Sequence, residues 1–363
     1  MVLNAAMPDE HQRRREALAT ELAGLEVRAA LITTLLNVRY LTGFTGSSAA
    51  LLVHDDGSAV LATDGRYELQ AATECPDLPA VITRSGRRDL ADRAIGAGAS
   101  QVGFEDLHLP VAAFRDLPHS APWTPLGTCL ERLRMVKDAG ELHALSLACA
   151  ATDGALEVSA DRIRPGVTER EVARWLDDEL RERSEGPGFE TIVASGPNGA
   201  IPHHQPTDRR IEAGDLVTID FGARVAGYHA DMTRTVLVGG RAAAWQSEAY
   251  QAVRRAQDAA VAALSPGCAA SEVDRAARNS LADAGLAEFF VHGLGHGVGL
   301  QIHEAPYLGS SSPDKLAVSV PVTVEPGVYL PGRGGVRIED TVVVHADHVE
   351  FLTTTTRDLM TLG

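Results

Sequence analysis

The pattern of hydrophobic and polar positions divides the chain into two parts. Over about the first 130 residues, short apolar runs alternate with segments of helical periodicity. The expected strands are AALITT, SSAALLV, GSAVLATD, AVITR and SQVGFE, and the expected helices are PDEHQRRREALATELAG, RYELQAATEC and RRDLADRAIGAG. The segment NVRYLTGFTG, between the first two strands, is expected to form a turn. Alternating strands and helices predict an α/β domain in which helices cover a sheet.

A proline-rich stretch, LPHSAPWTPLGTCLERLRMVKD, separates this part from the rest. We place the boundary near Pro122 to Lys137 and predict domains over residues 1–130 and 131–363. The elements expected beyond it are the helices Asp138–Ala160, Thr168–Arg183, Ala242–Leu264 and Ser271–Ala284, the strands Asp215–Gly222 and Tyr228–Val238, and a strand-rich end over VPVTVEPGVYL, GVRIEDTVVVH and HVEFLT. Because helices and strands are grouped here, the second domain is predicted to be α+β with a curved antiparallel sheet.

Composition narrows the functional classes. The chain of 363 residues is 45% hydrophobic and 23% charged, which is typical of globular domains. Its net charge of −16 argues against a nucleic-acid partner, because phosphates would be repelled. The beginning of the chain has no apolar signal segment, and there is no apolar run near 20 residues, so we expect a cytoplasmic protein without a membrane anchor. The scattered cysteines Cys75, Cys129, Cys149 and Cys268 are expected to be reduced and to bind no zinc.

Four carboxylates and one imidazole in the second domain are candidates for a shared metal site. They are Asp220 in VTIDFGA, Asp231 in GYHADMTRT, His296 in HGLGHGVG, Glu325 in VTVEPGVY and Glu339 in GVRIEDT. Each acid follows or interrupts an apolar strand pattern, where an unpaired carboxylate would be costly to bury. Oxygen ligands favour Mn²⁺-like ions, and imidazole also suits Co²⁺, Zn²⁺ or Fe²⁺. Together the five residues predict two divalent ions and a hydrolase.

Two histidine-rich segments are further candidates. VHGLGHGVGLQIHEAP contains His292, His296 and His303 among glycines, and IPHHQPTD contains His203 and His204 beside prolines. A flexible glycine loop and a surface pair of histidines are the alternative interpretations. A histidine here could hold a developing oxyanion or transfer a proton.

The motifs together resemble those of the aminopeptidase P/prolidase (Xaa-Pro peptidase) family, whose catalytic domain has the pita-bread fold. The run TIVASGPNGAIPHHQPTDRRIEAGDLVTIDFGARVAGYHADMTRTVLVG, with HGLGHGVGLQIHEAP, TVEPGVYLPG and GVRIED, carries this resemblance. Upstream, NVRYLTGFTGSSAALLV and TDGRYELQA resemble the smaller N-terminal domain of the family. The resemblance covers nearly the whole chain. Methionine aminopeptidases share the site but typically lack this N-terminal domain.

The resemblance implies roles for individual residues. Asp220, Asp231, His296, Glu325 and Glu339 correspond to the five metal ligands, with Asp231 and Glu339 shared by both ions. Residues on the substrate side are His203, which fits better than His204, together with His292 and His303; Arg337 would orient the carboxylates, with Tyr329 and Thr233 as further supporting residues. Glu325 is also expected to take a proton from water and pass it to the proline nitrogen.

The implied reaction is hydrolysis of the Xaa–Pro bond at the N-terminus of a peptide with proline at its second position. Two divalent ions are expected, Mn²⁺ first, and a homodimer or homotetramer is expected. Prolidases tend to carry an arginine before the TVEPG glutamate, where this chain has only Lys315. We therefore favour an aminopeptidase over an Xaa-Pro dipeptidase. A metal-free creatinase-like hydrolase, a non-catalytic binding module and a phosphotriesterase-like activity are the remaining alternatives.

A second departure lies just before the TVEPG strand. Where relatives usually have a Gly-Met turn, this chain has Ser319 and Val320. Pro321 then predicts an edge position or a bulge, because proline cannot donate to a neighbouring strand.

Overall fold

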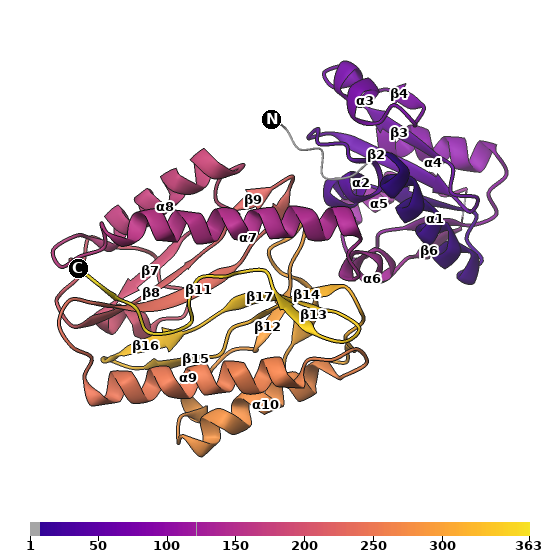
Figure 1. Cartoon of the computed structure of the whole chain (residues 1–363). Coiled ribbons are helices and arrows are strands. Elements are labelled where there is room, and N and C mark those ends of the chain that lie inside the picture. The colour runs from indigo at the N-terminus through magenta and orange to yellow at the C-terminus, as the bar shows by residue number, and fades with distance from the viewer. Residues whose placement is uncertain (1–7, 121) are drawn as a thin grey trace. The chain divides into compact units, whose positions relative to one another are not determined.

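The computed structural model describes residues 8–120 and 122–363. The contacts divide the chain into two compact units, one ending at Arg134 and the other running from Met135 to Gly363 (Figure 1). The boundary expected between residues 130 and 131 falls inside a helix, α6 (Cys129–Met135). In the part of the chain that the structure describes, no helix is long and apolar enough to cross a membrane.

The N-terminal unit is built on a six-stranded sheet of order β4-β3-β2-β1-β5-β6. Its strands are β1 (Ala29–Ile32), β2 (Ala49–His54), β3 (Ala59–Thr63), β4 (Ala80–Ile82), β5 (Val102–Phe104) and β6 (Trp123–Pro125). Strand β2 is antiparallel to β1 and β3, and the other neighbours are parallel. Five strands therefore point the same way, and their carboxyl ends share one edge.

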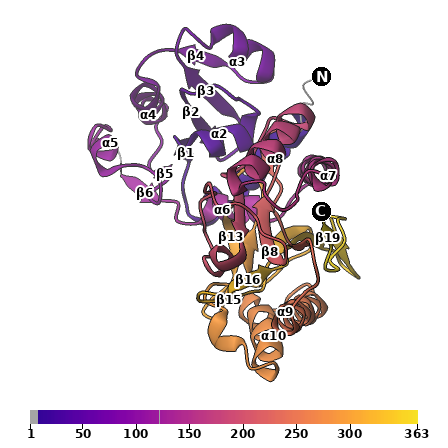
Figure 2. The same cartoon turned by 90° about the vertical axis from the view of Figure 1, so that its left-hand side faces the viewer.

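Helices cover both faces of this sheet. The helices of this unit are α1 (Pro8–Gly24), α2 (Leu35–Thr42), α3 (Glu68–Glu74), α4 (Gly86–Gly96), α5 (Val111–Arg115) and α6. Leu90 and Ala94 of α4 pack on Leu31 and Leu52 of the sheet. In Figure 2, strands β1, β2 and β3 lie between α4 and α2. The α/β domain is thus as predicted, except that LLNVRYLT forms the helix α2 where a turn was expected.

The C-terminal unit contains two larger antiparallel sheets. One has the order β19-β11-β8-β7 and the other β13-β12-β14-β17-β18, while β9–β10 and β15–β16 form short ribbons. The strands are β7 (Ile192–Ser195), β8 (Asp215–Phe221), β9 (Arg224–Val225), β10 (Tyr228–His229), β11 (Met232–Val238), β12 (Gly295–Gly297), β13 (Glu304–Leu308), β14 (Val320–Val324), β15 (Gly327–Leu330), β16 (Gly334–Arg337), β17 (Asp340–Val344), β18 (Val349–Phe351) and β19 (Thr361–Leu362). Only β19 pairs in parallel within the larger sheets.

Two pairs of helices pack on these sheets. They are α7 (Ala139–Ala160) with α8 (Glu169–Arg183), and α9 (Ala244–Ala263) with α10 (Ala270–Asp283); the short 3-10 helices are η1 (Gly196–Ala200) and η2 (Ala287–Phe289). Apolar residues of α7 and α8 form one core with β7, β8 and β11, and those of α9 and α10 form another with β13, β14 and β17. Figure 1 shows the strands between the two helix pairs.

The expectation for Pro321 was wrong. Strand β14 lies inside its sheet, between β12 and β17. Proline is nevertheless accommodated at this position, because β12 pairs with β14 only at Val322, so Pro321 has a strand partner, Val343 of β17, on one side alone. The strain lies two residues earlier, at Ser319, whose φ of 65° is in the left-handed region that favours glycine.

Candidate active site

All nine residues predicted for the site line one pocket of about 310 Å³ in the C-terminal unit. They are His203, Asp220, Asp231, His292, His296, His303, Glu325, Arg337 and Glu339. Tyr329 also lines this pocket, and apolar walls that the sequence did not indicate come from Phe189, Ile192, Ile302, Tyr307 and Leu308. The structure therefore brings together side chains that are up to 136 positions apart, from His203 to Glu339.

The two aspartates are held by the β8–β11 hairpin. Asp220 lies in β8, where it pairs with Thr233 of β11. Asp231 was expected inside a continuous strand, but it lies in a break between β10 and β11. Gly222 makes this break possible, because a Cβ at that position would lie 1.8 Å from the carbonyl oxygen of Ala230. The hairpin therefore turns the Asp231 side chain into the pocket.

The two glutamates also lie where strands are interrupted. Glu325 follows β14 and Glu339 precedes β17, two neighbouring antiparallel strands. The backbone N–H of Glu325 donates to the carbonyl of Leu294 at 2.8 Å. Thr233 fixes Glu339 twice: its carbonyl accepts from the Glu339 N–H at 3.0 Å, and its Oγ1 donates to Glu339 Oε2 at 2.7 Å.

His296 is oriented as a metal ligand would have to be. Its Nδ1 lies 3.0 Å from the carbonyl oxygen of Gly297, which can only accept, so Nδ1 carries the proton. The unprotonated Nε2 then faces Asp231 Oδ2 and Glu325 Oε1, each at 3.5 Å. Burial, with a further contribution from His303, lowers the pKa of His296 to about 4, which keeps the ring neutral at pH 7.

The charges in the pocket do not balance without cations. Burial and the neighbouring carboxylates raise the pKa of Asp231 and Glu325 well above their ordinary values, and burial with Asp220 raises the pKa of Glu339 to about 8. Arg337 is the one guanidinium that lines the described pocket. Asp220 Oδ1 is buried without a hydrogen-bond partner among the described residues. Carboxylate or imidazole atoms of Asp231, His296 and Glu339 lie within 4.8 Å of one another. This donor set fits divalent cations.

Arg337 connects the acids to the substrate side of the pocket. Its Nη2 donates to Asp220 Oδ2 at 2.7 Å, and its Nε donates to Thr233 Oγ1 at 3.1 Å. Its Nη1 donates to the hydroxyl of Tyr329 at 2.8 Å. That hydroxyl lies 2.8 Å from Nε2 of His292, whose Nδ1 lies 2.7 Å from the carbonyl of Gly293. Because Nδ1 must donate to this carbonyl, Nε2 accepts from Tyr329.

The remaining histidines differ in their exposure to solvent. His203 and His303 are exposed at the pocket, and the His303 ring lies 4.4 Å from the His296 ring. His204, in contrast, is buried and lies 2.9 Å from Glu169 Oε2. Glu169 also accepts from Ser195, Asn198 and Thr207, so it fastens the segment that carries His203.

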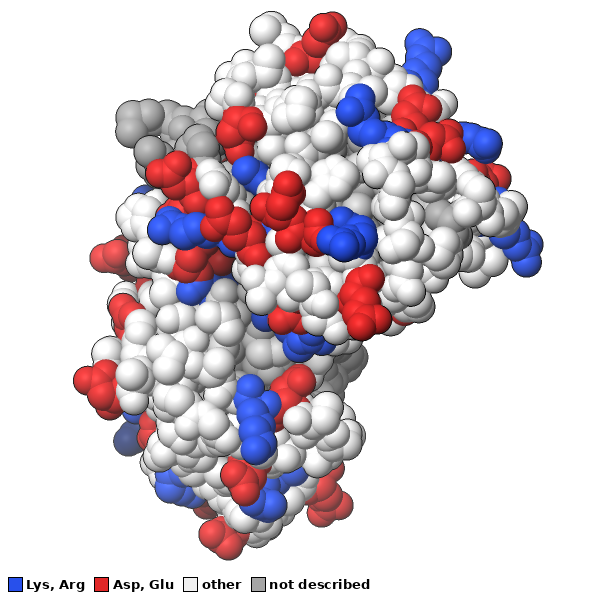
Figure 3. All heavy atoms as spheres, turned by 90° about the vertical axis from the view of Figure 1, so that its right-hand side faces the viewer, with Lys and Arg blue, Asp and Glu red and all other residues white. Residues whose placement is uncertain are grey.

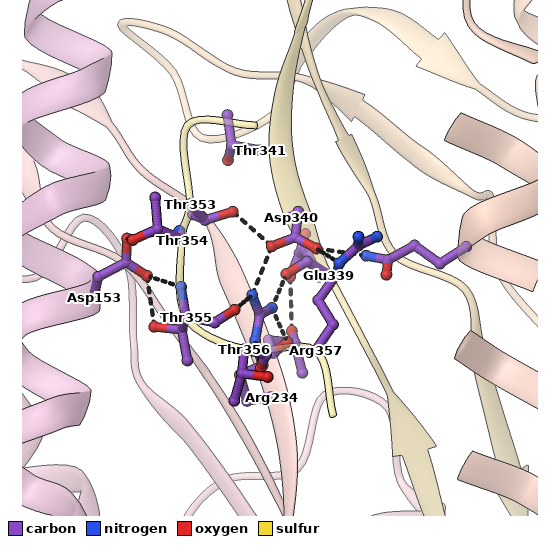
Figure 4. A network of polar contacts seen from close by, with 12 residues as sticks. Asp153, Arg234, Glu339, Asp340, Thr341, Thr353, Thr354, Thr355, Thr356 and Arg357 are labelled. Atoms are coloured by element: carbon purple, nitrogen blue, oxygen red, sulfur yellow. Dashed lines mark hydrogen bonds and ion pairs between the residues drawn. The ribbon is translucent and has the colours of Figure 1, made fainter. Parts of the chain in front are cut away.

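A buried polar network behind Glu339 was not predicted (Figure 4). The side chain of Arg234 is fully buried, and its five N–H donors match five acceptors. Two are carbonyls of Thr233 and Glu339, one is Asp340 Oδ1 at 2.6 Å, and two are carbonyls of Thr355 and Thr356. The sequence signal for the pair of Arg234 and Asp340 was a charged residue within each of two apolar strands, MTRTVLV and DTVVV.

The same network extends to Asp231 and to the end of the chain. Thr341 Oγ1 donates to the carbonyl of Asp231 at 2.8 Å. Asp340 also accepts from Thr353 Oγ1 at 2.7 Å and from the amide of Gln257 at 2.8 Å. The C-terminal segment therefore supports both bends that carry Asp231 and Glu339.

Curved sheets flanked by two helix pairs, with a carboxylate-rich pocket between the strands, define a metal-dependent hydrolase of the pita-bread fold. Residues 143–346 match metallopeptidase family M24, and residues 14–136 match the creatinase/prolidase N-terminal domain. The chain belongs to metallopeptidase family M24. The resemblance to Xaa-Pro peptidases and the predicted two-part fold are thereby confirmed.

Individual relatives match over almost their whole length. An Xaa-Pro dipeptidase of Pyrococcus horikoshii is 35% identical over 338 residues, which cover 92% of this chain and 95% of that protein. The solved Xaa-Pro dipeptidase from Bacillus anthracis has a TM-score of 0.92 at 34% identity and covers 97% of this chain and 100% of its own. The X-Pro aminopeptidase from Thermotoga maritima has a TM-score of 0.88 at 32% identity, with coverage of 94% and 100%.

Proposed function

We propose that this metallopeptidase removes the first residue from peptides whose second residue is proline, and that it accepts tripeptides and longer substrates. One observation carries the preference for length. Among the described residues that line the pocket, Arg337 is the only lysine or arginine, and its guanidinium is bound to Asp220, Thr233 and Tyr329. A dipeptide places its carboxylate on the proline itself, where it would need a free cation. Lys315 does not line this pocket.

We assign the metal ligands to Asp220, Asp231, His296, Glu325 and Glu339, with two divalent ions, preferably Mn²⁺. The orphaned oxygen of Asp220 and the unprotonated Nε2 of His296 support this assignment. When bound, such ions polarise the substrate carbonyl and lower the pKa of water.

The side chains around the ligands would then perform the remaining tasks. Glu325 Oε1 would accept a proton from water and deliver it to the proline nitrogen, which must be protonated as it leaves. His303 and His203, at the open side of the pocket, would hold the carbonyl oxygen and the proline end of the substrate. His292 and Tyr329 would keep Arg337 in place, and Arg337 would hold Asp220.

An Xaa-Pro dipeptidase is the second candidate. It is supported by the relatives of that name in Pyrococcus horikoshii and Bacillus anthracis, while the Thermotoga maritima relative bears the aminopeptidase name. A dimer or tetramer and a cytoplasmic location stay predictions.

The test compares hydrolysis of Gly-Pro with hydrolysis of Ala-Pro-Pro-Ala in Mn²⁺, each with a chelated control. Cleavage of the longer peptide, abolished by chelator, is the expected result. Cleavage of the dipeptide alone would replace the proposal with the dipeptidase. If neither peptide is cleaved by metal-loaded protein, the Xaa-Pro substrate class itself is wrong.

A further inference from the structure

A second cavity, in the N-terminal unit, is larger than the active-site pocket. Its volume is about 580 Å³, against about 310 Å³ for the pocket described above. Thr33 follows β1, Thr63 ends β3, and Thr83 follows β4, and all three line the cavity. Because these strands run in the same direction, the cavity lies outside their carboxyl ends. This is the place where open α/β sheets bind ligands.

Three arginines line this cavity. Arg84 lies between β4 and α4, while Arg87 and Arg88 belong to the first turn of α4. Among the described residues, neither Arg84 nor Arg87 has an ion-pair partner, whereas Arg88 lies 3.8 Å from Asp92 and donates to the carbonyl of Asp116 at 3.4 Å. Four other arginines of this unit are paired with acids, namely Arg15 with Asp77, Arg28 with Asp55, Arg66 with Asp64 and Arg132 with Glu21. In the part of the chain that the structure describes, no acid therefore neutralises the guanidinium groups of Arg84 and Arg87 at the cavity.

The residues that line the cavity carry more positive than negative charge, whereas the chain as a whole is negatively charged. The lining of the cavity holds three guanidinium groups and one carboxylate, Asp116, although the whole chain has a net charge of −16. On the face drawn in Figure 3, acidic and basic side chains are interspersed instead. The amino end of α4, which Ser85 does not cap with its side chain, adds positive potential, part of which is offset by Asp89 in the same turn, whose carboxylate accepts from Thr83 Oγ1 at 2.5 Å. An anion in this cavity would therefore be stabilised.

The rest of the lining suits a polar ligand. Ser47, Ser48 and Ser85 line the cavity together with Thr33 and Thr83. Hydroxyl groups can donate to phosphate oxygens or bind the hydroxyls of a sugar. Guanidinium groups match the geometry of phosphate with paired N–H donors. The volume lies in the range of pockets that bind small molecules, about 300–1,000 Å³.

We propose that this cavity binds a small phosphate-bearing anion, with Arg84 and Arg87 as its principal ligands. The site is separate from the metallopeptidase pocket and does not depend on the substrate assigned there. Either inorganic phosphate or a phosphate ester could supply the recognised group.

The test is calorimetric titration of the full-length metal-loaded chain with inorganic phosphate and with adenosine 5′-monophosphate. Both probes are titrated into wild type, the double variant Arg84→Gln/Arg87→Gln, and the control Arg13→Gln/Arg93→Gln. The control changes the same charge in the same unit, at exposed positions outside the cavity. Thermal unfolding of all three proteins verifies that they are folded.

We expect saturable binding that weakens at least tenfold in Arg84→Gln/Arg87→Gln and changes less than twofold in the control. Tighter binding of adenosine monophosphate than of phosphate would identify an ester as the ligand, and equal binding would identify free phosphate. Absence of saturable binding, equal weakening in both variants, or binding unchanged in Arg84→Gln/Arg87→Gln would overturn the proposal. The last result would place phosphate elsewhere, such as at the metal ions.

Discussion

At the scale of a single residue, Glu325 is assigned two roles, metal binding and proton transfer. In the proposed function it binds metal and also transfers a proton, and its Oε1 lies 3.5 Å from Nε2 of His296, another assigned ligand. Glu325→Gln keeps the shape of the side chain but removes its basicity, so we expect kcat to fall by about 10²–10⁴. Glu350→Gln, at an exposed position of β18, is the matched control. Steady-state kinetics with Ala-Pro-Pro-Ala measure both, and a loss of less than tenfold in Glu325→Gln would remove its assigned role.

Ser319 offers a test of backbone strain. With a φ of 65°, this residue occupies a conformation that costs L-residues roughly 1 kcal/mol and costs glycine little. Ser319→Gly is therefore expected to raise the free energy of unfolding in urea titrations by about 0.5–1 kcal/mol, which is the relief of strain less the cost of the greater freedom that glycine gives the unfolded chain. Ser319→Ala keeps the Cβ and should give no gain. Equal stability of the glycine and alanine variants would contradict the interpretation.

The site residues that could be predicted from the sequence are acidic side chains that follow apolar segments. Asp220 at the end of an apolar run and Glu325 after VTV were recognisable because burial of a lone acid is costly. The breaks at Asp231 and Glu339 were not predicted, because they depend on contacts between distant strands, such as the approach of Gly222 to Ala230. The apolar walls at Phe189 and Tyr307 were missed for the same reason.

Among the secondary-structure elements, β11 and β17 depend on one buried ion pair. Arg234→Met would leave Asp340 charged and partly unpaired, and breaking such a pair typically costs about 3–5 kcal/mol. We expect that loss in urea unfolding, together with at least tenfold weaker Mn²⁺ binding by calorimetry, because Glu339 and Asp231 lose their support. The control is Arg241→Met, an exposed position after β11. Weakened stability with unchanged metal affinity would limit Arg234 to folding.

The stability of the folded chain is expected to depend on pH through Glu169 of helix α8. Burial would raise its pKa, but hydrogen bonds from Thr207, His204, Asn198 and Ser195 outweigh burial and lower the pKa to about 2. The folded pKa is thus below the unfolded value of about 4.5, so this stabilisation is complete above pH 4.5 and is lost as pH falls towards 2. Its size is about 3 kcal/mol.

Glu169→Gln measures this contribution. The variant should be less stable than wild type by about 2–3 kcal/mol at pH 7, and the difference should shrink as pH falls below 4.5. Glu182→Gln, exposed on the same helix, should behave as wild type. A difference between Glu169→Gln and wild type that stays constant from pH 7 to pH 3 would show that the carboxylate charge is irrelevant.

At the scale of the whole molecule, metal binding and folding are linked. Ions that bind the folded chain stabilise it by about 2.7 kcal/mol at a concentration 100 times the Kd. We expect Mn²⁺ to raise the midpoint of thermal unfolding and chelator to lower it. In His296→Ala the shift should be much smaller, since this variant lacks the imidazole that the proposed function assigns as a ligand. An equal shift in both proteins would place the ions outside the pocket.

The attachment of Arg234 to Thr355 and Thr356 also has a consequence for the order in which the site can form. These contacts join residues that are 121 and 122 positions apart in the sequence. The bend that carries Glu339 therefore gains this support only after the segment with Thr355 and Thr356 has folded back onto β11, and variants truncated before Thr353 should be unable to assemble the peptidase site.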